Sequence, residues 1–170
     1  MNQIDLEQLA GFLVRAKVAA YAGDGKELEP ERKDFKELEY SEGDLYYRDS
    51  YVGVYRAPGQ EVVRENGKPI WVMSYDGGMA EKYYSDNEMT GQAIGFLKEA
   101  LKAITPDIPY RGPAELIKDD WRYVNEIEGD IKSFRGNEKI FHRASRDQAK
   151  PDKDELVFEQ NYIGGLVVGK

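Results

Sequence analysis

Apolar residues recur at helical spacing in two segments of the chain. Asp5 can cap the first segment, with Gln8 three residues later, and the apolar stripe that follows comprises Leu6, Leu9, Leu13, Ala16 and Ala20. Ser85 and Glu88 form a capping box ahead of the second segment, whose broader stripe comprises Met89, Ala93, Phe96, Leu97, Ala100, Leu101 and Ile104. The pattern predicts two amphipathic helices, separated by a long region of different periodicity.

Alternation of apolar and polar residues marks that region and the part of the chain after the second helix. Tyr47, Asp49 and Tyr51 share one face of a tyrosine-rich strand, where they can form the polar wall of a pocket. Asn66 and Gly67 stand between two runs rich in β-forming residues, which is the signature of a type I′ hairpin. Alternation returns after residue 121, so we predict further antiparallel strands there.

The two halves of the chain, residues 5–79 and 85–168, resemble each other in the order and spacing of marked positions. The correspondences pair Tyr47 with Tyr123, Gly59 with Gly136, Glu61 with Glu138, and Trp71, Tyr75, Gly77 and Gly78 with Phe158, Tyr162, Gly164 and Gly165. These matches predict an internal duplication, each unit being a helix followed by three strands. We expect one α+β domain over residues 1–170, with a twisted antiparallel sheet of about six strands, two helices packed on one face, and a groove between the halves.

The cysteine and histidine content and the net charge of the chain argue against several classes of binding site. The chain has no cysteine and one histidine, which argues against zinc and haem sites, and it shows no calcium-loop spacing among its carboxylates, so we predict no metal site and no cofactor. Its formal net charge is −8. The acidic balance opposes direct binding to nucleic acid or to an anionic membrane. The first residues do not have the pattern of a signal peptide, and no apolar run is long enough to span a bilayer, so we expect a cytoplasmic protein.

Five residues are the candidates for lining the groove. Tyr51, Trp71 and Tyr75 offer aromatic surface, although a Trp in a central hairpin is usually part of the core. Arg111 lies in a Pro- and Gly-rich loop, where its fork can bind a carboxylate or phosphate, or tie the loop to the sheet through a salt bridge. Glu61 follows a turn glycine at the start of a strand and completes the set.

Glu61 and Glu138 also support a catalytic interpretation. They occupy equivalent positions in the two halves, and two carboxylates facing each other across a cleft can act as acid and base. The competing interpretation is structural, with each carboxylate bound to a nearby arginine or to the backbone. A hydrolase-like enzyme therefore stays open as an alternative.

Several blocks of sequence resemble domain-of-unknown-function family 5680. They are Gly43–Tyr51, Gly59–Val63, Gly67–Tyr75, Pro109–Pro113, Gly136–Phe141 and Tyr162–Gly165. The resemblance brings no established activity. Members of this bacterial and archaeal family sometimes follow a helix-turn-helix module, whereas only one predicted helix precedes the strands of this chain, so the resemblance implies a sensor or partner-binding half standing alone.

Together these features lead to one functional expectation and two alternatives. The expected role is noncatalytic binding of a small molecule or a protein partner in the groove between the halves. The alternatives are the hydrolase with paired carboxylates and a homodimer formed through an exposed edge of the sheet.

Overall fold

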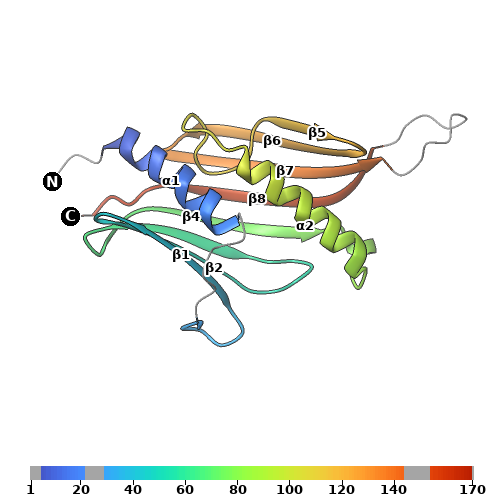
Figure 1. Ribbon diagram of the computed structural model, residues 1–170, viewed down its shortest axis with the longest axis horizontal. Coiled ribbons are helices and arrows are strands. Elements are labelled where there is room, and N and C mark those ends of the chain that lie inside the picture. Colours follow the sequence, from blue (N-terminus) through green and yellow to red (C-terminus); the bar gives the residue numbers. More distant parts are fainter. Residues whose placement is uncertain (1–4, 22–28, 144–153, 170) are drawn as a thin grey trace, which may run out of the picture.

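The computed structural model describes residues 5–21, 29–143 and 154–169, which form one open antiparallel sheet with two helices on one of its faces (Figure 1). The helices are α1 (Leu6–Tyr21), the 3-10 helix η1 (Glu81–Tyr83) and α2 (Asn87–Lys102). The strands are β1 (Lys36–Glu42), β2 (Leu45–Tyr51), β3 (Gly59–Glu65), β4 (Lys68–Met79), β5 (Glu115–Lys118), β6 (Trp121–Asp130), β7 (Ser133–Arg143) and β8 (Asp154–Leu166). Neither described α-helix is long and apolar enough to cross a membrane.

The strand order β1-β2-β3-β4-β8-β7-β6-β5 brings the two halves of the chain together at the centre of the sheet. Each α-helix is followed by four described strands, and the last strand of each set, β4 or β8, lies at this junction. The two central strands run antiparallel, with Tyr75 directly opposite Tyr162. The topology therefore places residues from both halves on one continuous surface under the helices.

The described sheet has eight strands, so the prediction of six was wrong. The two additional strands, β1 and β5, lie at the edges and each pairs with a single described neighbour. β1 is rich in glutamate and β5 has only four residues, both of which are usual in edge strands that face solvent. β5 is too short to show a clear alternation, whereas Leu38 and Tyr40 of β1 do alternate and pack against the core, so β1 has a signal that the prediction of six strands did not count.

Local capping explains where both α-helices begin. The Oδ1 of Asp5 accepts hydrogen bonds at the start of α1, including one from the Gln8 amide at 3.1 Å, which confirms the predicted cap. α2 begins one residue later than predicted, because Asp86 is its cap and accepts from the Met89 amide at 2.9 Å. Ser85 instead has a positive φ of 78° and lies outside the helix.

The hairpin between β3 and β4 forms as predicted. Asn66 and Gly67 have φ values of 49° and 78°, so both occupy the left-handed region that a type I′ turn requires. The turn pairs Glu65 with Lys68, and a bulge between Val63 and Arg64 then shifts the register by one residue, so that Glu61 pairs with Met73. The hairpin therefore fixes the position of Glu61 on the helix-facing side of the sheet.

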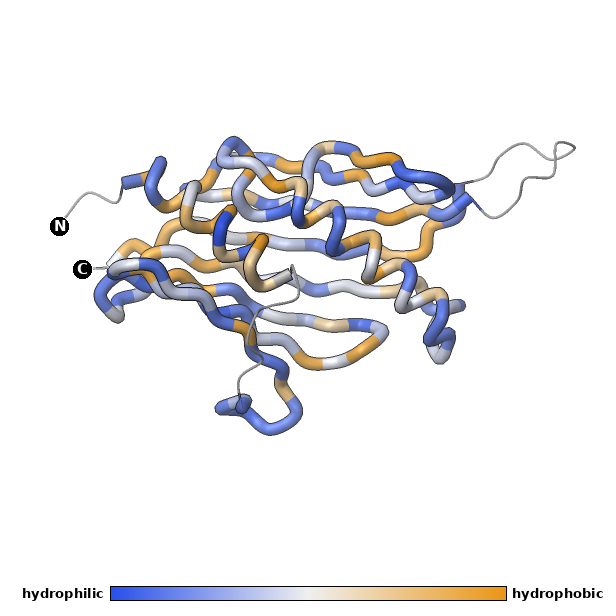
Figure 2. The backbone as a smooth tube through the Cα atoms, in the orientation of Figure 1, coloured by the Kyte–Doolittle hydropathy of each residue, from blue (hydrophilic) through white to orange (hydrophobic). Residues whose placement is uncertain are grey.

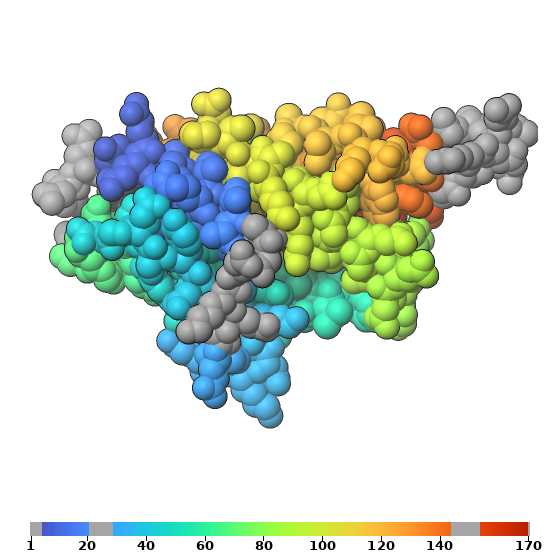
Figure 3. All heavy atoms as spheres, viewed as in Figure 1, coloured from blue at the N-terminus to red at the C-terminus, as the bar shows by residue number. Residues whose placement is uncertain are grey.

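Two groups of buried side chains fill the space between the helices and the sheet. One lies between α1 and the centre of the sheet and contains Leu9, Phe12, Leu13, Tyr47, Val63, Trp71, Met73 and Phe134. The other lies under α2 and contains Ala93, Leu97, Leu101, Tyr123, Ile140 and Phe158. Apolar stretches lie along the helices and strands, and the segment leading into β1 is hydrophilic (Figure 2). The side chains of α1 and α2 cover the centre of this face (Figure 3).

Replacing Gly95 with alanine is expected to raise the free energy of unfolding by about 0.5–1 kcal/mol, because glycine loses more backbone freedom than alanine in a helix. Gly95 lies within α2, and an added Cβ would have no heavy atom within 4 Å. Gly136→Ala should act in the opposite direction, since its Cβ would lie 2.3 Å from the Tyr162 ring. Urea unfolding measures both changes, and a Gly95→Ala variant less stable than wild type would contradict the prediction.

Candidate functional site

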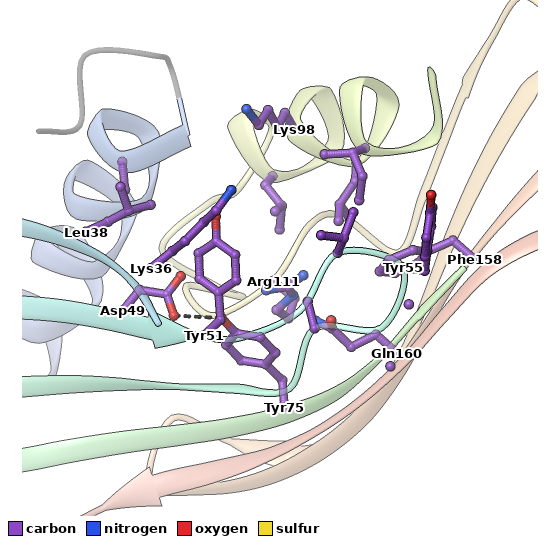
Figure 4. Close-up of a pocket in the computed structure, with 18 residues that line it drawn as sticks. Lys36, Leu38, Asp49, Tyr51, Tyr55, Tyr75, Lys98, Arg111, Phe158 and Gln160 are labelled. Atoms are coloured by element: carbon purple, nitrogen blue, oxygen red, sulfur yellow. Dashed lines mark hydrogen bonds between the residues drawn. The ribbon is translucent and has the colours of Figure 1, made fainter. Parts of the chain in front are cut away.

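A cavity of about 380 Å³ lies between the helices and the sheet (Figure 4). Side chains from β2, β4 and β8 form its floor, and α2 covers it from the other side. Residues from both halves of the chain line the cavity, and its apolar lining includes Leu38, Val54, Leu97, Leu101 and Phe158. A mainly apolar concave space with a few polar groups is the usual form of a small-molecule site.

Glycines in β4 shape one side of the cavity. A Cβ on Gly78 would lie 2.0 Å from the Tyr55 carbonyl oxygen, and one on Gly77 would lie 2.2 Å from the Glu159 carbonyl oxygen. The segment between β2 and β3 can therefore lie directly against β4, where the Ala57 amide donates to the Gly77 carbonyl oxygen at 2.9 Å. This close approach carries Tyr55 and Ala57 into the wall of the cavity.

The alternation of β2 brings polar and aromatic side chains to the same place. Tyr47 is fully buried, whereas Asp49 and Tyr51 line the cavity. The Tyr75 hydroxyl on β4 donates to Asp49 Oδ1 at 2.7 Å, shown as the dashed line in Figure 4. Of the three residues predicted to form a polar wall, Asp49 and Tyr51 line the cavity and Tyr47 does not, and Tyr75 adds to them from β4, on the other side of β3.

A buried ionic network extends from the cavity into the protein. Arg111 donates to both carboxylate oxygens of Glu138, from Nε at 3.1 Å and from Nη2. Tyr123 and Gln160 donate to the same carboxylate, at 2.7 Å and 3.1 Å. Arg111 also lies 3.9 Å from Glu61 through Nη1, and so it connects the two glutamates.

Lys17 completes the network from α1. It is fully buried and forms an ion pair with Glu61. Burial lowers the pKa of Lys17, and the negative charge of Glu61 opposes that effect. The lysine therefore holds the C-terminal half of α1 against β3, close to the cavity.

Asp49 joins this network at the surface of the cavity. Burial, together with the charge of Glu61, raises the pKa of Asp49 to about 7. The described network contains two cations, Lys17 and Arg111, and three carboxyl groups. A proton on Asp49 thus brings these five side chains to neutrality.

Three of the five predicted lining residues line the cavity: Tyr51, Tyr75 and Arg111. Trp71 does not. Its side chain is fully buried, its Nε1 donates to the Ile131 carbonyl oxygen at 3.2 Å, and its ring stacks on Phe134.

Glu61 also lies outside the lining, as does Glu138. Both carboxylates are fully buried and are held by the cations of the network, Lys17 and Arg111. Both glutamates approach Arg111, and neither lines the cavity.

Sequence reasoning missed Lys17, Gln160, Lys36 and Lys98. The first did leave a signal, because Lys17 continues the apolar stripe of α1 at the spacing set by Leu9 and Leu13. A lysine on a buried helix face requires a carboxylate partner, which indicates an internal ion pair. The other three have no local signal, since only the assembled fold brings them to one cavity.

Fold and site together define an α+β domain with an open antiparallel sheet and a cavity above a buried ionic network. The chain belongs to the family described as domain of unknown function (DUF5680), whose model matches residues 49–167. The match begins near the end of β2, so α1 and β1 lie outside it. Comparison with curated proteins and with solved structures gives no significant match.

Proposed function

We propose that this domain binds a small molecule in the cavity between its helices and its sheet, without catalysing a reaction on it. The observation that carries the proposal is the lining itself. It combines aromatic and aliphatic walls with a small set of converging polar groups, chiefly Asp49, Tyr75, Arg111 and Gln160. Apolar walls supply affinity, and a few fixed polar groups supply orientation and specificity.

The polar groups of the cavity are held in place by the network beneath them. Gln160 and Arg111 both donate to Glu138, and Tyr75 donates to Asp49. Groups fixed in this way lose little conformational entropy when a ligand arrives, which favours binding. A sensor-like role fits such a preformed site, because α1 and α2 both contribute to it.

The position of the glutamates supports the noncatalytic form of the proposal over a hydrolase. A general acid or base must reach the reacting atoms of the substrate, directly or through one water. Glu61 and Glu138 are instead fully buried beside Lys17 and Arg111. Both carboxylates therefore serve in the network that supports the cavity floor.

The proposal includes the internal duplication of the chain. Tyr75 and Tyr162 pair with each other across the junction of β4 and β8, as equivalent residues about a twofold axis would. Their hydroxyls make matching hydrogen bonds, to Asp49 at 2.7 Å and to Asn125 at 2.6 Å. In this scheme the two halves differ at this position: the first half has the ionisable Asp49, which lines the cavity, and the second half has the neutral Asn125, which does not.

Thermal unfolding in the presence of a broad metabolite panel tests the proposal. We expect one compound class to raise the unfolding midpoint, since a ligand at 100 times its Kd stabilises the native state by about 2.7 kcal/mol. Tyr51→Ala removes a ring from the wall and should reduce this shift. Tyr46→Ala is the matched control, because Tyr46 is a half-buried residue on the opposite face of the same strand.

Two outcomes would count against the proposal. A midpoint shift that Tyr51→Ala leaves unchanged would place the ligand elsewhere on the protein. The absence of any shift, combined with a dimer in size-exclusion chromatography with light scattering, would favour the homodimer, with the outer edge of β1 as the interface.

A further inference from the structure

We propose that the ligand is a small carboxylic acid with an apolar body, bound as its carboxylate beside Lys36 and Lys98. This inference rests on the proposed binding function and names the chemistry of the ligand. It starts from the distribution of charge around the cavity.

The described lining of the cavity is basic although the chain is acidic. Lys36, Lys98 and Arg111 line it, against the one acid Asp49, while the whole chain has a net charge of −8. Arg111 already forms an ion pair with Glu138 in the buried network, so the two lysines carry the positive charge that is open to a ligand. An excess of positive charge in one cavity of an acidic protein favours an anionic ligand, because the cavity walls limit screening by solvent.

The two lysines are available to such a ligand. Both are exposed, and neither side chain forms an ion pair or a hydrogen bond with another described residue. Lys36 enters from the start of β1 and Lys98 from α2. Figure 4 shows their amino groups on the same side of the cavity, away from Tyr75 and Gln160. An anionic group at this side can therefore contact lysines from two elements.

The remainder of the cavity accepts an apolar body. Tyr51 and Phe158 contribute aromatic surface, and Leu97 and Leu101 contribute aliphatic surface from α2. A volume of about 380 Å³ lies within the usual range for small-molecule sites and accommodates a ring with a short substituent.

The two helices favour a carboxylate over a phosphate. Ala20 and Leu101 line the cavity from the last turns of α1 and α2, so the C-terminal ends of both helices lie near it. These ends have a partial negative charge, which opposes a dianion more than a monoanion. Lysine also lacks the planar fork with which arginine holds phosphate oxygens.

Asp49 restricts the other end of the ligand. Its carboxyl lies at the floor beside Tyr75, and burial favours its protonated form, with a pKa of about 7. A second anionic group in this position would meet the Asp49 carboxyl and be disfavoured. The floor therefore selects a monoacid, with a hydrogen-bonding group or an apolar edge at its inner end.

Matched compounds test the inference directly. Phenylacetate, 4-methylpentanoate and indole-3-acetate are titrated by calorimetry beside their amides, with phenyl phosphate and phenethylamine as further arms. We expect at least one carboxylate to bind about ten-fold more tightly than its amide, and this preference should diminish as salt is added. An amide or the amine binding as well as the carboxylates, or the phosphate binding more tightly, would overturn the carboxylate assignment.

Variants locate the anionic group. The double variant Lys36→Gln with Lys98→Gln should weaken the best carboxylate about ten-fold and leave its amide unchanged. Lys102→Gln is the matched control, because it removes the same charge from an exposed position on α2 outside the lining. A carboxylate that binds equally to the double variant would refute the lysine site. If Tyr51→Ala still abolished that binding, the proposed cavity function would stand, whereas binding by no compound in the panel would count against both.

Discussion

Arg111→Ala is expected to lower the free energy of unfolding by about 3–5 kcal/mol, because it leaves a buried carboxylate without its cation. Arg111 is 1% exposed and is the cationic partner of the fully buried Glu138. Tyr123 and Gln160 would still donate to Glu138, but neutral donors do not compensate a full charge away from water. The loss is a large part of the stability of an ordinary domain, and urea unfolding measures it.

Arg135→Ala is the matched control for that experiment. Arg135 lies on β7, the strand of Glu138, and donates to Glu128 at 2.8 Å and 2.6 Å, but both side chains are about 70% exposed. Its loss should change stability by no more than about 1 kcal/mol. Equal effects of the two alanine variants would contradict the structural importance of the buried network.

A double variant covers the case in which Arg111→Ala does not fold. Arg111→Met combined with Glu138→Gln removes both charges and keeps most of the side-chain volume. Replacing both members of a buried ion pair is usually far less costly than removing one. The double variant should therefore be more stable than Arg111→Ala, and a double variant of lower stability would argue against an uncompensated charge as the cause.

Much of the fold follows from patterns within short stretches of sequence. The apolar stripe after Asp5 and the Asn66-Gly67 turn have local physical causes, and both form as expected. The edge strands β1 and β5 are less clear in the sequence, because β5 has only four residues and β1 has only two apolar residues, Leu38 and Tyr40, among charged and polar ones. Strand number was therefore the least predictable feature of the sheet.

The candidate site shows where local reasoning ends. Alternation places Trp71 and Tyr75 on the same face of β4, and it cannot tell which of them lies under a packed helix. In the structure Trp71 stacks on Phe134 in the core, while Tyr75, four residues later, lines the cavity. Whether a residue of this face is buried or lines the cavity depends on where α1 and α2 cross the sheet. The sequence of a single strand does not contain that information.

Long-range ion pairs were equally inaccessible from the sequence. Lys17 and Glu61 are 44 residues apart, and Arg111 and Glu138 are 27 residues apart. Periodicity can place each residue on an inward-facing side of its element, but it offers no means of choosing the partner. Arg111 was recognised because its Pro- and Gly-rich loop has an unusual composition.

The free energy of unfolding of the Asp49→Asn variant should rise relative to that of wild type as the pH increases from 5 to 8. The folded-state pKa of Asp49, about 7, lies above its ordinary value of 3.8, so the folded protein holds a proton that the unfolded chain releases. The stability contributed by this proton is complete below pH 3.8 and is lost as the pH rises through 7. The introduced amide cannot titrate, and its oxygen can still accept from Tyr75, as Asn125 does from Tyr162.

The free energy of unfolding of Asp49→Asn, relative to wild type, should therefore increase by about 1–3 kcal/mol over this range and level off above pH 7. Lys17 is present in both proteins, so its own titration largely cancels from the difference. Asp76→Asn, which removes an exposed carboxylate from β4, should keep the pH dependence of wild type. A constant difference between Asp49→Asn and wild type would mean that Asp49 is charged throughout, and that the buried network does not need its proton for neutrality.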